Sequence, residues 1–344
     1  MRHHFICLLI ASFLFACKDK PGNNEKVQSK PAFTDTTACI FSEIAYCSDP
    51  QQQLYKFLPG WKVIWNPAAV GGNHAFVATN GSVNVIAFRG SLINFSEDAL
   101  NNWIFHDLNV GSQEPWPYSN TSKANISTGS YIAWQNVEKM KDKSTGKTLW
   151  VYLSENVPEN AALFLTGHSL GGNLATVYAS YLSWKFNEVK RPRTNINVIT
   201  FAAPAPGNKS FAMDFNSVFP LAIRFENTND IVPKFPCSSS IRKLGSLYSP
   251  LPSADTIQIG YKNITTSLGN VFSLMGTALD LLELKSDFYG YEHTCSDGKL
   301  ITIPLSGKNI TNHPVSWFAE AGYQHGMAQY AAALGAPVID CDIH

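Results

Sequence analysis

The sequence has no excess of charge of either sign. Its 344 residues include 26 Lys and Arg against 26 Asp and Glu, and only 15% of the residues are charged. No run of basic residues stands out, and proteins that bind nucleic acids use clustered Lys and Arg against the phosphates. We therefore expect no nucleic-acid partner.

Cysteines with metal-binding spacing are also missing. The seven cysteines form no Cys-x-x-Cys pair and no His/Cys cluster with zinc spacing, so we predict no structural metal. The chain also has no internal repeat and no interior linker, and 45% of its residues are apolar. This composition is typical of a globular protein and favours one large domain.

The apolar run at residues 5–16 is too short to span a membrane, and it fits the apolar part of a secretory signal peptide. The run leads into Leu-Phe-Ala-Cys at residues 14–17, which resembles a bacterial lipobox, where the cysteine becomes the lipid-modified first residue. An ordinary signal peptide cleaved near Ala16 is the alternative. The resemblance predicts a protein exported to the bacterial cell envelope and anchored to a membrane through Cys17.

These features divide the chain into three parts. We predict a signal peptide over residues 1–16 and a polar, flexible tether over residues 17–34. A folded domain is expected over residues 35–344, with Asp35 as the N-cap of its first helix.

Four continuous apolar runs bounded by turn residues are typical of strands that are buried on both faces. They lie at Val83–Phe88, residues 161–165, Ile196–Phe201 and residues 221–225. An amphipathic helix follows the second run, because apolar residues recur at 174, 177, 178, 181 and 182. This alternation predicts an α/β fold with a mostly parallel central sheet and helices on both faces. Ligands bind such sheets beyond the carboxyl ends of the strands.

One of these carboxyl ends carries a Gly-x-Ser-x-Gly motif, centred on Ser169 between Gly167 and Gly171. A strand precedes the motif and the amphipathic helix follows it, which is the strand–turn–helix setting of a nucleophile elbow. The two glycines avoid side-chain collisions across the sharp turn. We predict that Ser169 is a nucleophile at the N-terminus of this helix, where free N–H groups favour negative charge.

A serine nucleophile needs a base and an acid, which in this fold follow in the order Ser, Asp or Glu, His. Asp230 lies in a loop after the fourth apolar run and is the predicted acid. Glu226 and Asp214 are the weaker alternatives.

Four histidines follow Asp230. His325 lies at a glycine-containing turn that enters the last helix, and it is the predicted base. His313 is the main alternative, His293 is expected in a surface loop, and His344 is the final residue.

Two backbone N–H groups should form an oxyanion hole. Leu170, directly after the nucleophile, is expected to supply one. Ser91, which follows Gly90 after the first apolar run, is expected to supply the other. The alternative is that Gly90 and Ser91 only form a turn.

Together these segments resemble the fungal-lipase-like family, also called class 3 lipases, of the α/β-hydrolases. The resemblance rests on four motifs and extends over about residues 36–341: residues 88–91, 166–172 and 229–233, and His325 with Tyr330. Residues 45–47 also resemble the end of the family's first helix. The resemblance implies a triad of Ser169, Asp230 and His325, oxyanion donors at Ser91 and Leu170, and no cofactor.

The resemblance also implies a lid, which in some members is a short helix after the first oxyanion residue. Leu100, Trp103, Ile104 and Leu108 form an apolar stripe at that place. A helix packed on the core is the alternative.

Some fungal members join a cysteine of the first helix to one near the C-terminus, which implies a Cys47–Cys341 disulfide here. Cys237 and Cys295 would then remain as a second pair. Cys39 and Cys47 should not pair, because eight residues on one helix separate them by roughly 12 Å.

The chain departs from the family between Asp230 and His325, where residues 250–290 look like an insertion. A broad apolar helical stripe runs through it, comprising Leu268, Val271, Phe272, Met275, Leu279 and Leu282. This helix is expected either to pack on the core or to form a second cap or a membrane-facing surface.

The predicted activity is that of a serine ester hydrolase, most simply a lipase that cleaves acylglycerols through an acyl-enzyme. A phospholipase and a feruloyl or other carbohydrate esterase are the enzymatic alternatives. The non-enzymatic alternative is a surface-anchored binding protein on a hydrolase scaffold.

Overall fold

The computed structural model describes residues 33–92, 109–261, 264–284, 289–295, 298–307 and 311–341. The predicted signal peptide, nearly all of the tether, Cys17 and His344 lie outside these residues. The same holds for the predicted lid residues Leu100, Trp103, Ile104 and Leu108. From Phe33 onward the chain forms one compact unit.

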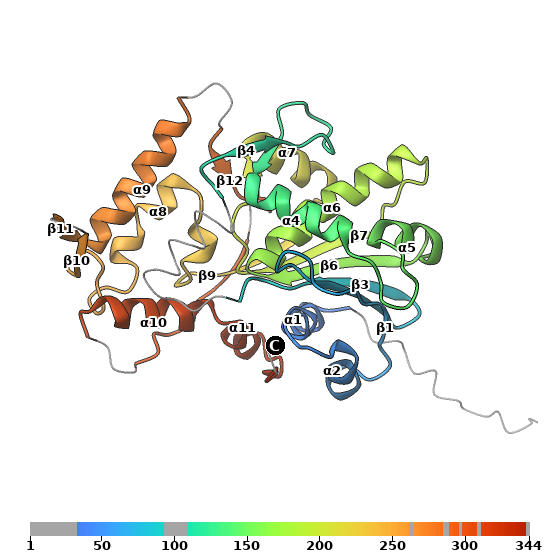
Figure 1. Cartoon of the computed structure of the whole chain (residues 1–344). Coiled ribbons are helices and arrows are strands. Elements are labelled where there is room, and N and C mark those ends of the chain that lie inside the picture. Colours follow the sequence, from blue (N-terminus) through green and yellow to red (C-terminus); the bar gives the residue numbers. More distant parts are fainter. Residues whose placement is uncertain are drawn as a thin grey trace, which may run out of the picture. The chain divides into compact units, whose positions relative to one another are not determined.

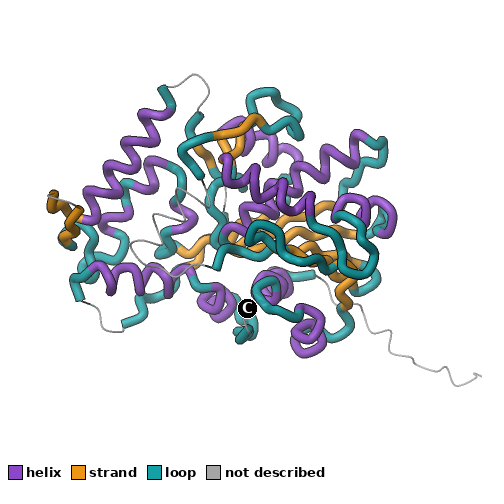
Figure 2. Tube along the Cα trace, in the orientation of Figure 1, coloured by secondary structure: helices purple, strands orange, loops and turns teal. Residues whose placement is uncertain are grey.

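A seven-stranded sheet lies at the centre of this unit (Figures 1 and 2), in the order β1-β2-β3-β6-β7-β9-β13. The strands from β3 to β13 run parallel, and β2 and β1 extend the sheet in antiparallel fashion. Their bounds are Lys62–Trp65 (β1), Ala75–Thr79 (β2), Val83–Phe88 (β3), Ala162–His168 (β6), Ile196–Phe201 (β7), Ile223–Asn227 (β9) and Lys299–Ile301 (β13). The predicted mostly parallel α/β fold is therefore confirmed.

Helices cover both faces of this sheet (Figure 1). One face carries α4 (Thr128–Lys139), α5 (Leu149–Asn156), α6 (Leu170–Glu188) and α7 (Lys209–Val218). The other face carries α1 (Asp35–Ile44), α2 (Pro50–Phe57) and α11 (Met327–Ala333). The predicted amphipathic helix is α6, and it directly follows β6.

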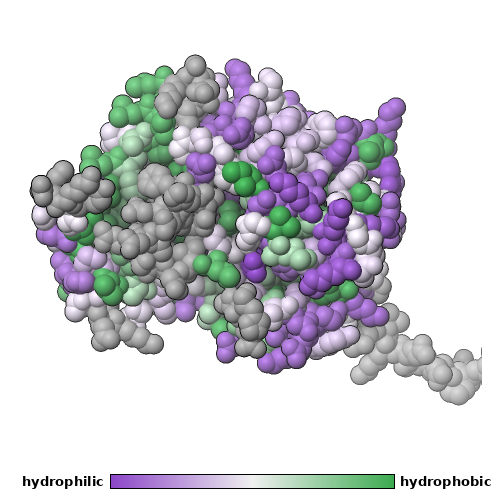
Figure 3. Space-filling model, viewed as in Figure 1, coloured by the Kyte–Doolittle hydropathy of each residue, from purple (hydrophilic) through white to green (hydrophobic). Residues whose placement is uncertain are grey.

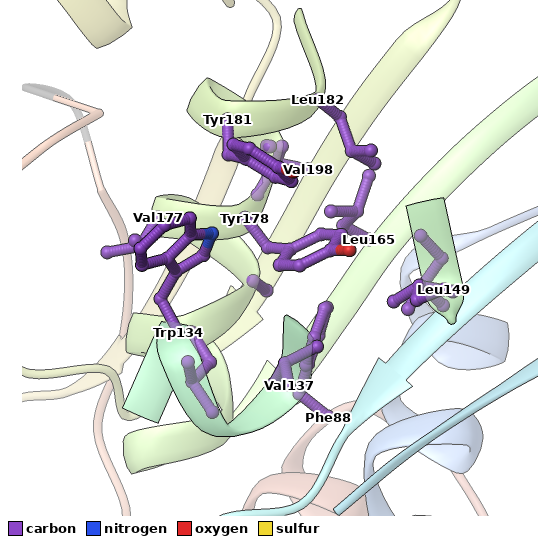
Figure 4. Packing of buried hydrophobic residues seen from close by; sticks show 14 of the residues in the cluster. Phe88, Trp134, Val137, Leu149, Leu165, Val177, Tyr178, Tyr181, Leu182 and Val198 are labelled. Atoms are coloured by element: carbon purple, nitrogen blue, oxygen red, sulfur yellow. The ribbon is translucent and has the colours of Figure 1, made fainter. Parts of the chain in front are cut away.

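The strand residues alternate between two apolar clusters, as side chains with a period of two must. In β3, Ile86 and Phe88 enter the cluster under α4 and α6, whereas Val85 and Ala87 enter the cluster under α1. Figure 4 shows side chains of α4 and α6 packed around Phe88 and Leu165. Each fully buried side chain of this size contributes about 1.5–3 kcal/mol, so the sheet is fixed from both sides. We call the sheet with these two clusters the sheet body.

A third apolar cluster lies beyond the sheet, around α8 (Ser238–Ile241), α9 (Leu268–Leu282) and α10 (Pro314–His325). Ile241, Phe272 and Trp317 are buried in it. We call these three helices and their cluster the helical body. The hairpin of β10 (Gln258–Tyr261) and β11 (Ile264–Ser267) precedes α9. A second, smaller antiparallel sheet has the strand order β12-β8-β5-β4. Its strands are Tyr291–Glu292 (β12), Gly207–Asn208 (β8), Asn125–Ser127 (β5) and Gln113–Pro115 (β4).

The helix expected in the insertion is α9. Its inner face packs into the third cluster through Leu268, Phe272 and Leu279. Its outer side leaves Leu274 65% exposed and Leu281 59% exposed. This helix therefore combines a packed face with an apolar surface.

Cys47 and Cys341 form a disulfide, as the family resemblance implied, and Cys39 is free. The second pairing was wrong, because Cys237 and Cys295 are both free thiols. The Cys237 sulfur lies against the Tyr291 carbonyl, whereas Cys295 lies four residues further along the chain, past β12.

Two predicted element ends also need correction. The N-cap of α1 is Thr34 rather than Asp35, and its hydroxyl accepts a hydrogen bond from the Thr37 amide over 3.1 Å. The fourth apolar run begins two residues before β9, because Leu221 lies in a turn and is 82% exposed.

Candidate active site

Ser169 occupies a strained turn between β6 and α6. Its φ is +58° and its ψ is −128°, a backbone conformation that residues other than glycine rarely adopt. Its amide donates to the Phe201 carbonyl over 2.9 Å, and its carbonyl accepts from the amides of Gly172 and Asn173. The hydroxyl is buried and makes no hydrogen bond within the described residues. Backbone hydrogen bonds therefore fix the position of Ser169, and its hydroxyl contributes no hydrogen bond to the described fold.

The glycines of the motif make this turn fit. A Cβ at Gly167 would overlap the backbone of Gly171, and a Cβ at Gly171 would overlap the Phe88 carbonyl. A Cβ at Gly172 would lie 2.9 Å from the Ala203 side chain. The turn can therefore pack against β3 and β7 only without side chains at these positions.

Asp230 and His325 form a buried hydrogen-bonded pair. The Asp230 Oδ2 lies 2.8 Å from the His325 Nδ1, and the two residues are 0% and 5% exposed. The Asp230 Oδ1 accepts from the Val232 amide over 2.9 Å, which fixes the carboxylate. An imidazole held in this way donates through Nδ1, so its Nε2 is the ring nitrogen that can accept a proton.

The same pair lies beside the serine. His168, the residue before Ser169, contacts His325, with ring centroids 4.5 Å apart and ring planes tilted by 36°. Asp230 and His325 are thus hydrogen-bonded to each other, and His325 contacts the residue that precedes Ser169.

Tyr330 joins this cluster, although sequence analysis assigned it no role beyond its place in a motif. Its hydroxyl donates to the Asp230 Oδ2 over 2.8 Å and accepts from the Asn227 amide over 2.9 Å. Burial raises the pKa of Tyr330 well above its ordinary value, which keeps this hydroxyl protonated. Asn227 in turn donates to the carbonyl and side chain of Gln324, next to His325. Nothing but the spacing of His325 and Tyr330 in the sequence hinted at this contact.

The alternative acids make other contacts. Glu226 is paired with Arg224 and with Lys234, whose Nζ lies 2.5 Å from it. These two cations lower the pKa of Glu226 against the opposing effect of its burial. Asp214 accepts from Ser119 and Asn120 beside α7.

The alternative bases also lie elsewhere. The His293 Nε2 lies 2.5 Å from the Pro233 carbonyl, and burial lowers the pKa of this histidine to about 4. His313 is the N-cap of α10, where its Nδ1 accepts from the Val315 amide. Neither histidine contacts Asp230 in any described hydrogen bond.

The two expected oxyanion donors, Ser91 and Leu170, line one cavity of about 300 Å³. Leu170 is the first residue of α6, so its N–H has no partner within the helix. Ser91 follows Gly90, which packs directly against the Ser169 side chain. Asn73, Arg89 and Asn136 also line this cavity.

The described residues form neither a metal-binding cluster nor a membrane-spanning helix. Within the described residues, no group of three His, Cys, Asp or Glu side chains is arranged to hold a metal ion. None of the helices in the same residues is both long and apolar enough to cross a membrane.

Comparisons with known proteins agree with this geometry. The sequence model of the class 3 lipases matches residues 85–240, which include the oxyanion segment, Ser169 and Asp230. A lipase of Caenorhabditis elegans is 30% identical over 98 residues, which make up 27% of this chain and 27% of that protein. This chain thus matches about a quarter of the length of that relative.

Among solved structures, M37 lipase has a similar fold over most of this chain. The crystal structure of M37 lipase superposes with a TM-score of 0.69 at 22% identity, covering 88% of this chain and 92% of that one. A lipase from Rhizopus microsporus var. chinensis gives a TM-score of 0.46 at 21% identity, covering 60% of this chain and 69% of that one. The segment at residues 85–240 therefore matches the class 3 lipases, and the fold of the chain is similar to that of M37 lipase.

Proposed function

We propose that this chain is a serine carboxylic-ester hydrolase, specifically a lipase that cleaves acylglycerols. The observation that carries the proposal is the Ser169 hydroxyl at a strained elbow, beside a buried His325–Asp230 pair. A hydroxyl that is buried without a partner costs stability, so its position calls for a functional reason.

The proposed reaction has two stages. The Ser169 Oγ attacks the ester carbonyl carbon while His325 accepts its proton, and Asp230 stabilises the imidazolium that forms. The N–H groups of Leu170 and Ser91 bind the oxyanion. His325 then protonates the leaving alcohol, and the acyl group remains on Ser169. A water molecule that loses its proton to His325 attacks this acyl-enzyme and releases the fatty acid.

The apolar surface of α9 supports a lipid as substrate. Leu274, Leu281 and Leu284 are 65%, 59% and 81% exposed, and Figure 3 shows apolar residues gathered over this helix. Large exposed apolar patches are typical of surfaces that meet a lipid or a protein. The proteins that this chain resembles are also named lipases.

The test is hydrolysis of chromogenic esters from acetyl to palmitoyl by the chain lacking residues 1–17. Ser169→Ala serves as the matched variant and should lose about 10⁴- to 10⁶-fold in kcat with its fold intact. A fluorophosphonate should add one label to the wild-type chain, located on Ser169 by mass spectrometry. Turnover by Ser169→Ala would contradict the assignment of the nucleophile.

The same series separates the alternatives. Turnover that rises toward palmitoyl supports a lipase, and added phospholipid vesicles would identify a phospholipase. Turnover confined to short chains favours a feruloyl or other carbohydrate esterase. No turnover at any length favours a binding protein on a hydrolase scaffold.

We also propose that Cys17 carries a lipid that anchors the protein in the bacterial cell envelope. The lipobox-like residues 14–17 support this proposal. Cys17→Ala in the full chain should move the protein from the membrane fraction to the soluble fraction. Continued membrane association of this variant would contradict the anchor.

A further inference from the structure

His168 lies between two parts of the candidate site and contacts both. Its Nδ1 is 2.8 Å from the Tyr46 hydroxyl, and its Nε2 is 2.8 Å from the backbone carbonyl of His325. The ring is buried, at 4% exposure. Both ring nitrogens of this histidine are therefore used inside the protein.

The direction of these hydrogen bonds follows from the groups involved. A carbonyl can only accept, so the Nε2 of His168 carries the hydrogen. In the neutral ring the Nδ1 is then an acceptor, and the Tyr46 hydroxyl must donate to it. Burial and the nearby His325 lower the pKa of His168 well below its ordinary value, which keeps the ring neutral.

The other end of this chain of bonds reaches the oxyanion segment. The Tyr46 hydroxyl also lies against Gly90. A Cβ at Gly90 would overlap this hydroxyl, so the tyrosine packs on the glycine backbone itself. Gly90 immediately precedes Ser91, the candidate oxyanion donor. A continuous series of contacts therefore runs from Gly90 through Tyr46 and His168 to the His325 carbonyl.

We propose that Tyr46 and His168 are positioning residues that hold the Gly90–Ser91 turn and His325 at fixed distances from Ser169. The inference rests on the proposed function, because it assigns these residues to the same reaction. Gly90 follows β3 in the sheet body, whereas His325 ends α10 in the helical body. Ser169 follows His168 directly, so the series passes through the residue next to the nucleophile.

Losing this alignment should slow the chemical step rather than weaken substrate binding. An oxyanion donor and a base act on the transition state, and a displacement of about 1 Å at a reacting centre can reduce the rate about 10²-fold. Neither Tyr46 nor His168 needs to touch the ester for this effect. The expected signature is therefore a lower kcat with a nearly constant KM.

Tyr46→Phe tests this directly, because it removes one hydroxyl and keeps the ring. We expect kcat to fall about 10- to 100-fold while KM changes less than about threefold. Tyr178→Phe is the matched control, since it also removes the hydroxyl of a buried tyrosine. This hydroxyl donates to Glu138 of α4 over 2.6 Å. The control should change the melting temperature but leave kcat within about twofold of the wild type.

His168→Gln provides the second variant. Its side-chain amide can still donate toward the His325 carbonyl, but it offers no acceptor where the Tyr46 hydroxyl points. If the series acts as one unit, adding Tyr46→Phe to His168→Gln should reduce kcat by less than about threefold further. Full multiplication of the two single losses would contradict a shared path.

The outcomes separate this inference from the proposed function. A wild-type chain that hydrolyses esters, together with a Tyr46→Phe variant whose kcat is within about twofold of it, overturns the positioning role alone. A wild-type chain that neither hydrolyses esters nor reacts with a fluorophosphonate overturns the proposed function and this inference with it. A loss in Tyr46→Phe that is restored by lowering the temperature to where both proteins are fully folded marks a structural role only and also overturns the inference.

Discussion

The sheet body and the helical body supply the candidate site in different ways. The sheet body provides Ser169 through residues that are neighbours along the chain, with glycines that pack against β3. The helical body provides His325 at the end of α10, 95 residues after Asp230. One part of the site is therefore encoded locally, and the other depends on how two apolar clusters come together.

Because of this difference, we expect the position of His325 to be more sensitive to substitutions than the turn at Ser169. The nucleophile turn is fixed by backbone hydrogen bonds and by strands buried on both faces. The base is held by the hydrogen bond of its side chain to Asp230 and by that of its backbone carbonyl to His168. Changes at the boundary between the two bodies should affect catalysis more than equal changes inside either body.

The largest effect is expected from Asp230→Asn, which removes the carboxylate that is hydrogen-bonded to the His325 Nδ1. An amide at this place donates toward the His325 Nδ1 or leaves it in the wrong tautomer, so kcat should fall on the order of 10³- to 10⁴-fold. Steady-state kinetics on a butyrate ester would measure the loss. Asp214→Asn, whose carboxylate accepts from Ser119 and Asn120, is the control and should keep its activity. Equal losses in both variants would contradict the assignment of Asp230.

The next prediction compares the loss of one buried tryptophan in each body. Trp317 in the helical body contacts Tyr248 and Phe272, with ring centroids 5.3 and 5.2 Å apart. Trp65 in the sheet body is equally buried. Each change to alanine should cost about 3–5 kcal/mol of unfolding free energy, measured by urea denaturation.

Their activities should differ. Trp317 lies on α10, which carries His325, so Trp317→Ala should lower kcat even at temperatures where the protein is folded. Trp65→Ala should keep kcat near the wild-type value under the same conditions. If the two variants lose activity in the same proportion, the helical body is no more coupled to the site than the sheet body.

A smaller effect is expected from the disulfide, which belongs to the outer face of the sheet body. Cys341→Ser opens a loop of 294 residues and should cost about 2–4 kcal/mol, seen as a lower melting temperature. The kcat of the folded variant should stay within about twofold of the wild type, because the substitution keeps Tyr46 and its contact with His168. Adding a reductant should lower the melting temperature of the wild type but not that of the variant.

The last comparison is pH-dependent and concerns Glu43, a buried carboxyl of α1 whose Oε2 has no hydrogen bond within the described residues. Burial raises the pKa of Glu43 from 4.5 to about 8. Because the folded pKa lies above the unfolded one, this carboxyl favours folding at low pH, and that stability is lost as the pH rises through about 8. Glu43→Gln stays uncharged, so its melting temperature should exceed that of the wild type increasingly between about pH 5 and pH 9.

Glu155→Gln, at an exposed position, is the matched control for this comparison. It should differ from the wild type by less than about 0.5 kcal/mol at each pH. A parallel pH dependence of wild type and Glu43→Gln would show that Glu43 is not buried as a neutral carboxyl.

The sequence was most informative where the pattern is local. The bounds of β3 and β7 follow directly from continuous apolar runs, since strands buried on both faces cannot carry many polar residues. The elbow at Ser169 follows from glycines at fixed spacing. The strand β13 could not be found in this way, because it has three residues and Leu300 in it is 65% exposed.

Contacts between distant residues were less accessible. Spacing along the chain could not show that Cys237 and Cys295 remain apart, since pairing depends on where each side chain points. It also could not show that Tyr330 bonds Asp230, which lies 100 residues earlier. The order of Asp230 and His325 was predictable only because the fold limits which acid and base can follow the serine.

The bond between Cys47 and Cys341 turns most of the folded chain into a ring. A single cut by a protease anywhere between these two positions leaves one covalent molecule rather than two fragments. Such a nicked protein would migrate as one band under denaturing conditions and separate into pieces only after reduction. It would also keep β3, β6, α6 and α10 tethered to one another, so the two halves of the site would stay close enough to reassemble.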